Sequence, residues 1–274
     1  MTHVTLIRPP LMFPKFRPGG TVNVIPPLGI AYVAGTLRAA GVEVTCIDAP
    51  GLGLERFRES ALDHRLTEQG LSLNEIIERI PPESSVIGIS CMFSYEWFYM
   101  IELIRAIRAR FPSQFVVLGG EHATADHEYI LKTMPEVDAC VLGEGEQKML
   151  SLVAALERGV AKAELPGCAV FAGGVVRRNE DPDGHYRIQD VNAIDRPAWD
   201  LLPLKEYLKF DHGGPGLRSI PMLASRGCPF RCAFCSSPKM WTTRWKARDV
   251  DDLIDEIKTY KRLYGINRVE FYDL

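Results

Sequence analysis

The 274-residue sequence lacks the marks of several protein classes. It has no excess of positive charge, because 32 Lys and Arg stand against 35 Asp and Glu, so nucleic acid is not an expected partner. It has no apolar run of about 18 residues, so a membrane partner is not expected either. The seven cysteines are odd in number, and no secretory signal peptide follows Met1. We therefore expect a cytoplasmic protein whose thiols are free or bound to metal.

Strand and helix patterns alternate in the first 165 residues. Short β-branched runs predict strands at 4–7, 42–47, 86–90, 115–118 and 139–142, and apolar spacing predicts helices at 28–40, 97–110 and 147–157. The runs are too apolar for half-exposed strands, which indicates an α/β fold with a doubly wound, Rossmann-like parallel sheet covered on both faces. Such sheets bind ligands beyond the carboxyl ends of their strands, where the Pro-, Ser- and Gly-rich loops of this chain fall.

The remainder of the chain divides into two parts. Residues 166–215 are rich in turns and predict a hairpin and a connector, so the first domain is expected to span 1–165. Residues 216–274 predict a strand at 220–224, a helix at 250–264 and a strand at 269–272. These elements are too few to close a barrel, so we expect the front part of a longer protein.

Three cysteines lie within eight residues on the loop after the strand at 220–224: Cys228, Cys232 and Cys235. Three thiolates can hold three irons of a 4Fe-4S cluster and leave the fourth iron open. A structural zinc site is an alternative, but it needs a fourth ligand, and His212 lies sixteen residues upstream without paired spacing. Three unconnected core cysteines are a second alternative, although the Gly, Pro and Arg between them favour an exposed loop.

The cysteine loop resembles the signature of the radical S-adenosylmethionine (radical SAM) superfamily. The matching features are the Cys-x3-Cys-x2-Cys spacing and an aromatic residue, Phe234, just before the last cysteine. The resemblance implies a cluster that binds and cleaves S-adenosylmethionine, with Phe234 against the adenine. It also implies that Phe271-Tyr272-Asp273 ends the second strand of a partial (βα)6 barrel, of which the chain holds the beginning.

The first domain resembles the cobalamin-binding domain of cobalamin-dependent radical SAM enzymes. Five motifs carry the resemblance: Arg8-Pro9-Pro10, Pro26-Pro27-Leu28-Gly29, Gly88-Ile89-Ser90, Gly119-Gly120-Glu121-His122 and Gly143-Glu144-Gly145-Glu146, and the connector 194–203 is also typical. The implied cobalamin contacts are Pro27, Leu28, Gly29, Ser90, Gly119, Gly120, Glu121, His122, Gly143, Glu144 and Gly145. Glycines after strands let the backbone approach a flat nucleotide base.

The remaining histidines and cysteines have simpler interpretations. The chain has no Asp-x-His-x-x-Gly loop after its first strand, so we expect cobalt without a histidine ligand, and His122 is interpreted as a hydrogen-bonding group. The other histidines are expected on the surface, and the cysteines outside the loop are expected to be buried apolar groups. These residues are His3, His64, His127, His185 and His212, and Cys46, Cys91, Cys140 and Cys168.

Together the resemblances imply a cobalamin-dependent radical SAM methyltransferase. A 5'-deoxyadenosyl radical would activate a carbon of a small-molecule or peptide substrate, methylcobalamin would supply the methyl group, and a flavodoxin or ferredoxin would supply electrons. Ring-forming or ring-contracting chemistry is an alternative, as is a non-catalytic cobalamin or iron–sulfur module. A first domain that has lost its ligand also remains open, because fold does not dictate function.

Overall fold

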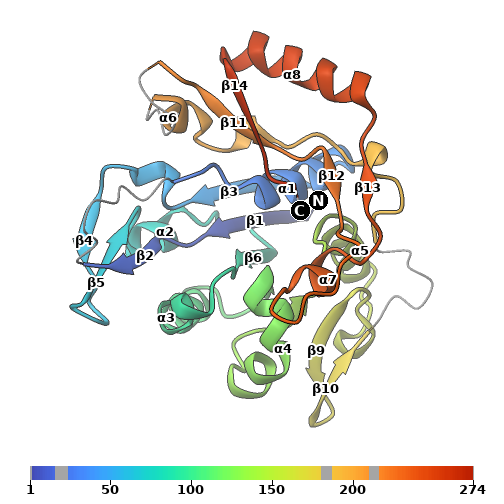
Figure 1. The fold of residues 1–274 in the computed structure, drawn as a ribbon. Helices are drawn as coiled ribbons and strands as arrows, with labels where there is room; N and C mark the ends of the chain where they lie inside the picture. The colour runs from blue at the N-terminus through green and yellow to red at the C-terminus, as the bar shows by residue number, and fades with distance from the viewer. Residues whose placement is uncertain (1, 16–23, 180–186, 210–215, 274) are drawn as a thin grey trace.

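A parallel sheet forms the first region of the chain. The computed structural model describes residues 2–15, 24–179, 187–209 and 216–273. Its largest sheet has seven strands in the order β10-β9-β8-β7-β6-β1-β3 (Figure 1). The parallel members are β1 (His3–Arg8), β3 (Glu43–Asp48), β6 (Val86–Ser90), β7 (Phe115–Gly119) and β8 (Ala139–Val141). The strand order reverses between β1 and β6, as in flavodoxin-like doubly wound sheets. The predicted fold class is confirmed.

Helices cover both faces of this sheet. One face packs against α1 (Leu28–Ala39) and α5 (Glu146–Glu157), and the other against α2 (Leu73–Arg79), α3 (Trp97–Arg110) and α4 (Glu121–Thr133). Successive side chains of a strand point to opposite faces, so Leu6 joins the core under α1 and α5 while Ile7 joins the core under α3. The helix predicted at 97–110 has those bounds in the structure.

The predicted hairpin is present, but its pairing with the main sheet was not predicted, and neither was a second group of antiparallel strands. The hairpin of β9 (Cys168–Ala172) and β10 (Val175–Arg178) pairs with β8 and so extends the main sheet, although the sequence placed it with the connector. A separate small sheet joins β2 (Leu11–Pro14), β5 (Leu66–Gln69) and β4 (Phe57–Glu59). Pairing between distant segments leaves little local signal. The domain boundaries at 165 and 215 stay predictions.

The second region begins a new parallel sheet. Strands β11 (Ser219–Met222) and β14 (Arg268–Phe271) pair in parallel, and α8 (Val250–Tyr264) connects them. Helix α8 begins at the N-cap Asp249, whose side chain accepts from the amides of Asp251 and Asp252. The remaining elements are α6 (Leu204–Lys209), α7 (Ser237–Met240), and the short antiparallel pair β12 (Ser225–Arg226) and β13 (Lys246–Ala247). The predicted strand–helix–strand order is present.

The connector fastens the second region to α1. Trp199 is fully buried and shares a hydrophobic cluster with Ala31 of α1, Ile220 of β11 and Tyr260 of α8. The amide of Ala198 donates to the carbonyl of Ala31 at 2.9 Å. This packing fixes β11 and α8 over the outer side of α1, as Figure 1 shows. Among the described residues, no helix combines the length and the apolar character needed to cross a membrane.

Candidate functional site

The three cysteines of the loop lie near the surface. Cys228 is half-buried, Cys232 and Cys235 are exposed, and none of them forms a disulfide. Gly227 has φ +85°, and a Cβ there would overlap the carbonyl of Arg244, so the backbone before Cys228 requires glycine. In the described parts of the chain, no three Cys, His, Asp or Glu side chains are gathered as metal ligands. The three thiols therefore lie on one loop, but in this structure they are not arranged around a common metal position.

The chemistry of this loop fits an iron–sulfur cluster. A cavity of about 330 Å³ adjoins Cys232, and it is lined by Arg187, Arg231, Cys232, Pro238, Thr242 and Thr243. Phe234 is 93% exposed and is free to contact a ligand. Exposed thiols beside open space are donors that a cluster can use. The alternative of three core cysteines is wrong, because two of the three thiols are exposed.

Of the four predicted glycines that follow β7 and β8, which are Gly119, Gly120, Gly143 and Gly145, only Gly119 borders open space. Gly119 pairs in register with Ser90, and a Cβ at Gly119 would meet no atom within 4 Å. A Cβ at Gly120 would lie 2.7 Å from the carbonyl oxygen of Cys91, and one at Gly143 would lie 3.0 Å from that of Met240. Both of these glycines also have positive φ. Gly120 and Gly143 thus serve close backbone packing, and the open space lies at Gly119.

His122 is buried in the first turn of α4. Its exposed fraction is 6%, its Nδ1 lies 2.9 Å from the Ser94 hydroxyl, and its Nε2 has no protein partner. Burial lowers the pKa of His122, so the ring is held neutral. The ring of Trp97 lies 5.0 Å away. The imidazole therefore belongs to the packed loop structure, which agrees with its interpretation as a hydrogen-bonding group.

The other predicted contacts lie at the starts of three helices. Pro27, Leu28 and the exposed Gly29 open α1, and the carbonyl of Pro27 accepts from the amide of Ala31 at 3.0 Å. Glu121 is the half-buried first residue of α4. Glu144 and Gly145 precede α5, but Glu144 is buried. A Cβ at Gly145 would lie 3.1 Å from Val33, so this glycine also packs closely.

Two histidines expected on the surface are buried, and that prediction is wrong for them. His3 bonds to the Thr45 hydroxyl at 2.8 Å, and His127 lies 3.1 Å from the carbonyl of Thr124. Such neighbours satisfy an imidazole without requiring exposure. His64 is exposed as predicted, and His185 and His212 lie outside the described residues.

Three of the four remaining cysteines are buried as predicted. They are Cys91, Cys140 and Cys168, whereas Cys46 is half-buried. Burial raises the pKa of Cys91 and of Cys168 to about 12, so both thiols stay protonated at neutral pH. Their role is apolar packing.

A buried ion cluster joins the sheet edge to the cysteine loop, and no local sequence pattern predicted it. Arg226 bonds to Glu144 at 3.3 Å and to Glu146 at 2.5 Å. Its guanidinium also lies over the rings of Tyr32 and Trp241. The acidic turn and the cysteine loop are both visible as motifs, but nothing local shows that they touch.

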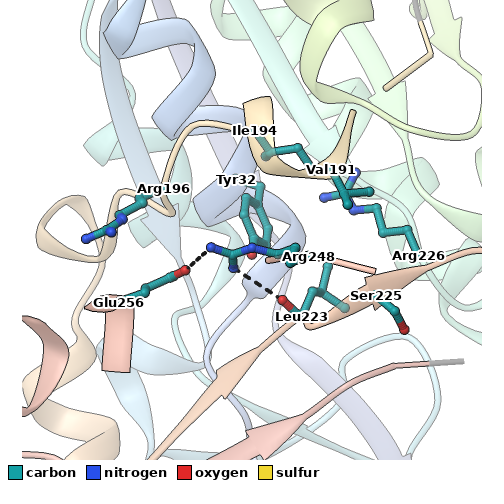
Figure 2. A pocket seen from close by; sticks show the side chains of 9 residues that line it. All are labelled: Tyr32, Val191, Ile194, Arg196, Leu223, Ser225, Arg226, Arg248 and Glu256. Atoms are coloured by element: carbon teal, nitrogen blue, oxygen red, sulfur yellow. Dashed lines mark hydrogen bonds and ion pairs between the residues drawn. The ribbon is translucent and has the colours of Figure 1, made fainter. Parts of the chain in front are cut away.

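A second buried ion cluster lies beside the first, on the side of α8. Figure 2 shows Arg248 bonded to Glu256 and to the carbonyl of Leu223. Tyr260 donates to Glu256 at 2.6 Å. The cavity that both clusters line has a volume of about 10 Å³, which leaves room for one water molecule at most. The two clusters therefore form a closely packed polar interface.

Glu96 is a buried carboxyl that the sequence did not single out. It follows β6 and accepts from the amide of Met12, which follows β1, at 3.4 Å. Burial raises the pKa of Glu96 to about 7. It lies beside the point where the strand order reverses, the usual ligand position in such sheets.

Comparisons with known proteins place the chain in a family. Residues 21–153 match the B12 binding domain. The chain is 34% identical, over 98% of its own length and 53% of the relative's, to an uncharacterized methyltransferase of Pyrococcus horikoshii. It is 30% identical, over 92% of its length and 42% of the relative's, to the anaerobic magnesium-protoporphyrin IX monomethyl ester cyclase of Rubrivivax gelatinosus. This chain belongs to the cobalamin-dependent radical SAM family.

Solved structures show the fold of this cobalamin-dependent radical SAM protein. A structure of the cobalamin-dependent S-adenosylmethionine radical enzyme OxsB matches with a TM-score of 0.72 at 19% identity, over all of this chain and 34% of that one. A structure of the radical S-adenosylmethionine methyltransferase TsrM from Kitasatospora setae matches with a TM-score of 0.66 at 18% identity, over all of this chain and 48% of that one. The chain spans about half the length of the first of these relatives.

Proposed function

We propose that the chain is the cofactor-binding part of a radical SAM methyltransferase that acts on an unactivated carbon. The observation that carries this proposal is the contact between the two regions at the functional edge of the sheet. Gly143, after β8, approaches the carbonyl of Met240, which ends the helix after the cysteine loop. Arg226, two residues before Cys228, bonds to Glu144. Ligands on the sheet edge and on the loop would therefore be neighbours.

Each cofactor has residues suited to hold it. Cys228, Cys232 and Cys235 would ligate the cluster, and Phe234 would lie against the adenine of S-adenosylmethionine. The open space at Gly119 would take the base of the cobalamin tail. When bound, the cluster supplies the electron that cleaves S-adenosylmethionine into a carbon radical, and cobalamin supplies a methyl group. The chain's own part is to hold these groups in position.

The described histidines would not ligate cobalt. His122 is the histidine nearest in sequence to the proposed base slot, and its ring is buried against Trp97 and Ser94. A neutral ring in that position serves packing and a local hydrogen bond. The proposal therefore keeps cobalt free of histidine.

The proposed surroundings follow from the exposed loop and the charge balance. The exposed Cys232 and Cys235 allow a flavodoxin- or ferredoxin-type donor to approach the cluster. We propose a small-molecule or peptide substrate, because the net charge of −3 offers no attraction to nucleic acid. We also propose a cytoplasmic location, because the free cysteines suit a reducing compartment.

Ring formation is the second candidate function. The relative named as a cyclase is 30% identical over 92% of this chain. A longer version of the protein, given reductant, cobalamin and S-adenosylmethionine with a labelled methyl group, separates the two. Labelled product supports methyl transfer, whereas unlabelled product together with 5'-deoxyadenosine supports ring chemistry. The 274 residues alone should release little 5'-deoxyadenosine, because β11 and β14 are the only parallel barrel strands among the described residues.

Anaerobic reconstitution tests cofactor binding directly. With iron and sulfide the chain should take up about four irons, the content of one cubane cluster. Tightly bound zinc without iron would contradict the proposal. Bound Co(II) cobalamin should show no nitrogen hyperfine splitting in its electron spin resonance spectrum. A splitting from a protein histidine would contradict the histidine-free cobalt, and one from the cofactor's own base would contradict the proposed base slot.

A further inference from the structure

Arg226 is the most enclosed cation at the interface of the two regions. Its side chain is 5% exposed, as buried as the two carboxylates that it contacts. Burial raises the pKa of Glu144, and Arg226 opposes this by favouring the ionised form. Removing one partner of a buried ion pair leaves an uncompensated charge, which costs far more than a surface pair. Arg226, Glu144 and Glu146 are therefore expected to stay paired with one another in the folded protein.

The position of Arg226 in the chain makes this cluster more than packing. Arg226 is followed by Gly227 and then by Cys228, and the amide of Cys228 donates to the carbonyl of Thr242 at 3.4 Å. Gly227 itself is pressed against the backbone of Arg244. Because Gly227 is constrained, a movement of Arg226 would also move the backbone of Cys228.

The carboxylate side of the cluster is connected to the sheet edge in the same way. Glu144 follows Gly143, whose amide donates to the Thr124 hydroxyl at 2.9 Å. Thr124 lies in α4, which begins directly after Gly119 and Gly120. One continuous set of contacts thus runs from the open space at Gly119 to Cys228.

We propose that Arg226 is a positioning residue that couples the cysteine loop to the cobalamin edge of the sheet, so that occupancy of one stabilises the other. The coupling rests on the proposed function, because it needs both cofactors to bind. The coupling is reciprocal by thermodynamic necessity. If bound cobalamin raises the affinity of the chain for the cluster by some factor, a bound cluster raises the affinity for cobalamin by the same factor. Neither cofactor needs to touch Arg226.

The second ion cluster provides a matched control. Glu256 is a buried carboxyl bonded to an arginine, Arg248, at the same interface. It belongs to α8 and contacts Arg248 and Tyr260 rather than the sheet edge. Glu256→Gln therefore perturbs a comparable pair without cutting the connection between Glu144 and Cys228.

Hydrogen exchange on the cofactor-free protein tests the mechanical connection. Arg226→Gln should raise amide exchange in both 143–147 and 227–236, because the two segments lose their shared anchor. Glu256→Gln should leave both segments at wild-type rates. Equal exchange in wild type and Arg226→Gln would overturn the proposal.

Iron release to a chelator tests the coupling between cofactors. In wild type, saturating cobalamin should slow iron release at least about fivefold, the lower end of typical coupling energies. The ratio of rates without and with cobalamin should fall to about one in Arg226→Gln and stay at the wild-type value in Glu256→Gln. A purely structural role would speed release in both conditions and leave the ratio unchanged, and that result would overturn the proposal.

Three further outcomes are distinguished. If Arg226→Gln does not fold, Glu146→Gln decides, because it keeps the Glu144 pair and should lower the ratio partway; an unchanged ratio there would overturn the coupling. If wild-type protein binds iron and cobalamin but has a ratio of one, the coupling is wrong while the proposed function stands. If wild type binds neither cofactor, the proposed function itself is contradicted.

Discussion

The sheet edge and the cysteine loop hold their functional residues in opposite ways. At the edge, loop backbone and side chains bond to one another, as in the Ser94–His122 and Thr124–Gly143 contacts. In the loop, Phe230, Cys232 and Phe234 are exposed. A large core supports the first region, whereas metal ligation commonly completes the folding of a loop of thiols. We infer that the protein itself holds the sheet edge in place, whereas the cysteine loop is expected to become ordered around its proposed cluster.

Loss of a cysteine should give the largest effect and should act on one region alone. Cys228→Ala, Cys232→Ala and Cys235→Ala should each lower the iron content from about four per chain to near zero, because each removes a cluster ligand. Iron analysis and the visible spectrum measure this. The affinity for cobalamin should fall only by the factor by which a bound cluster strengthens cobalamin binding.

The buried Cys168→Ala and the half-buried Cys46→Ala are the controls and should keep the full iron content. Retention of four irons by Cys232→Ala would show that the loop is not the cluster site.

Trp199→Ala should break the attachment between the regions. The indole is fully buried between α1, β11 and α8, so its loss should cost about 3–5 kcal/mol of unfolding free energy. Denaturant titration measures the cost, and a second transition would show that the regions unfold separately. Trp245→Ala is the control, because that ring is exposed. An equal effect of both substitutions would contradict the bracing role of the connector.

Glu96→Gln should change how the stability of the first region depends on pH. Burial raises the pKa of Glu96 from an ordinary 4.5 to about 7, so the folded state keeps a proton that the unfolded state loses. The raised pKa lowers the free energy of unfolding of the wild type. This destabilisation is absent below pH 4.5, grows from pH 4.5 to 7 and is complete above pH 7, where it reaches about 3 kcal/mol. The variant should therefore be more stable than wild type at pH 8 and equal at pH 4. Unfolding midpoints that differ equally at both values would contradict this, and the exposed Glu55→Gln serves as control.

Gly119→Val should test the base slot with the smallest energetic effect. A side chain there would fill open space without meeting protein atoms, so the fold should persist. Overpacking of about 1–3 kcal/mol against the bound base corresponds to roughly 5- to 150-fold weaker cobalamin binding. Spectral titration with cobalamin measures it, and Gly119→Ala should give a smaller loss.

The larger substitutions Gly120→Val and Gly143→Val would also prevent binding, but through strain in the folded state, since both residues have positive φ. They are poorer tests of the slot. Unchanged affinity in Gly119→Val would place the base elsewhere.

The helix at 97–110 shows what local pattern can predict. The predicted bounds are those of α3. The buried residues of α3 recur at helical spacing and are Tyr99, Met100, Leu103, Ile104 and Ile107. The hairpin at β9 and β10 shows the limit, because its turn is visible while its pairing with β8 depends on a strand far along the chain. The same holds for Arg226, whose partners lie 82 and 80 residues away.

The spacing of the three thiols, the alternation of strands and helices and the family resemblance could all be predicted, because each depends on residues that are neighbours in the sequence. The open space at Gly119, the close packing of Gly120 and Gly143, the burial of His3 and the contact of Arg226 with the acidic turn became visible in the folded structure. These properties depend on what surrounds a residue in space. Close packing brings together atoms whose separation along the chain carries no information about their contact.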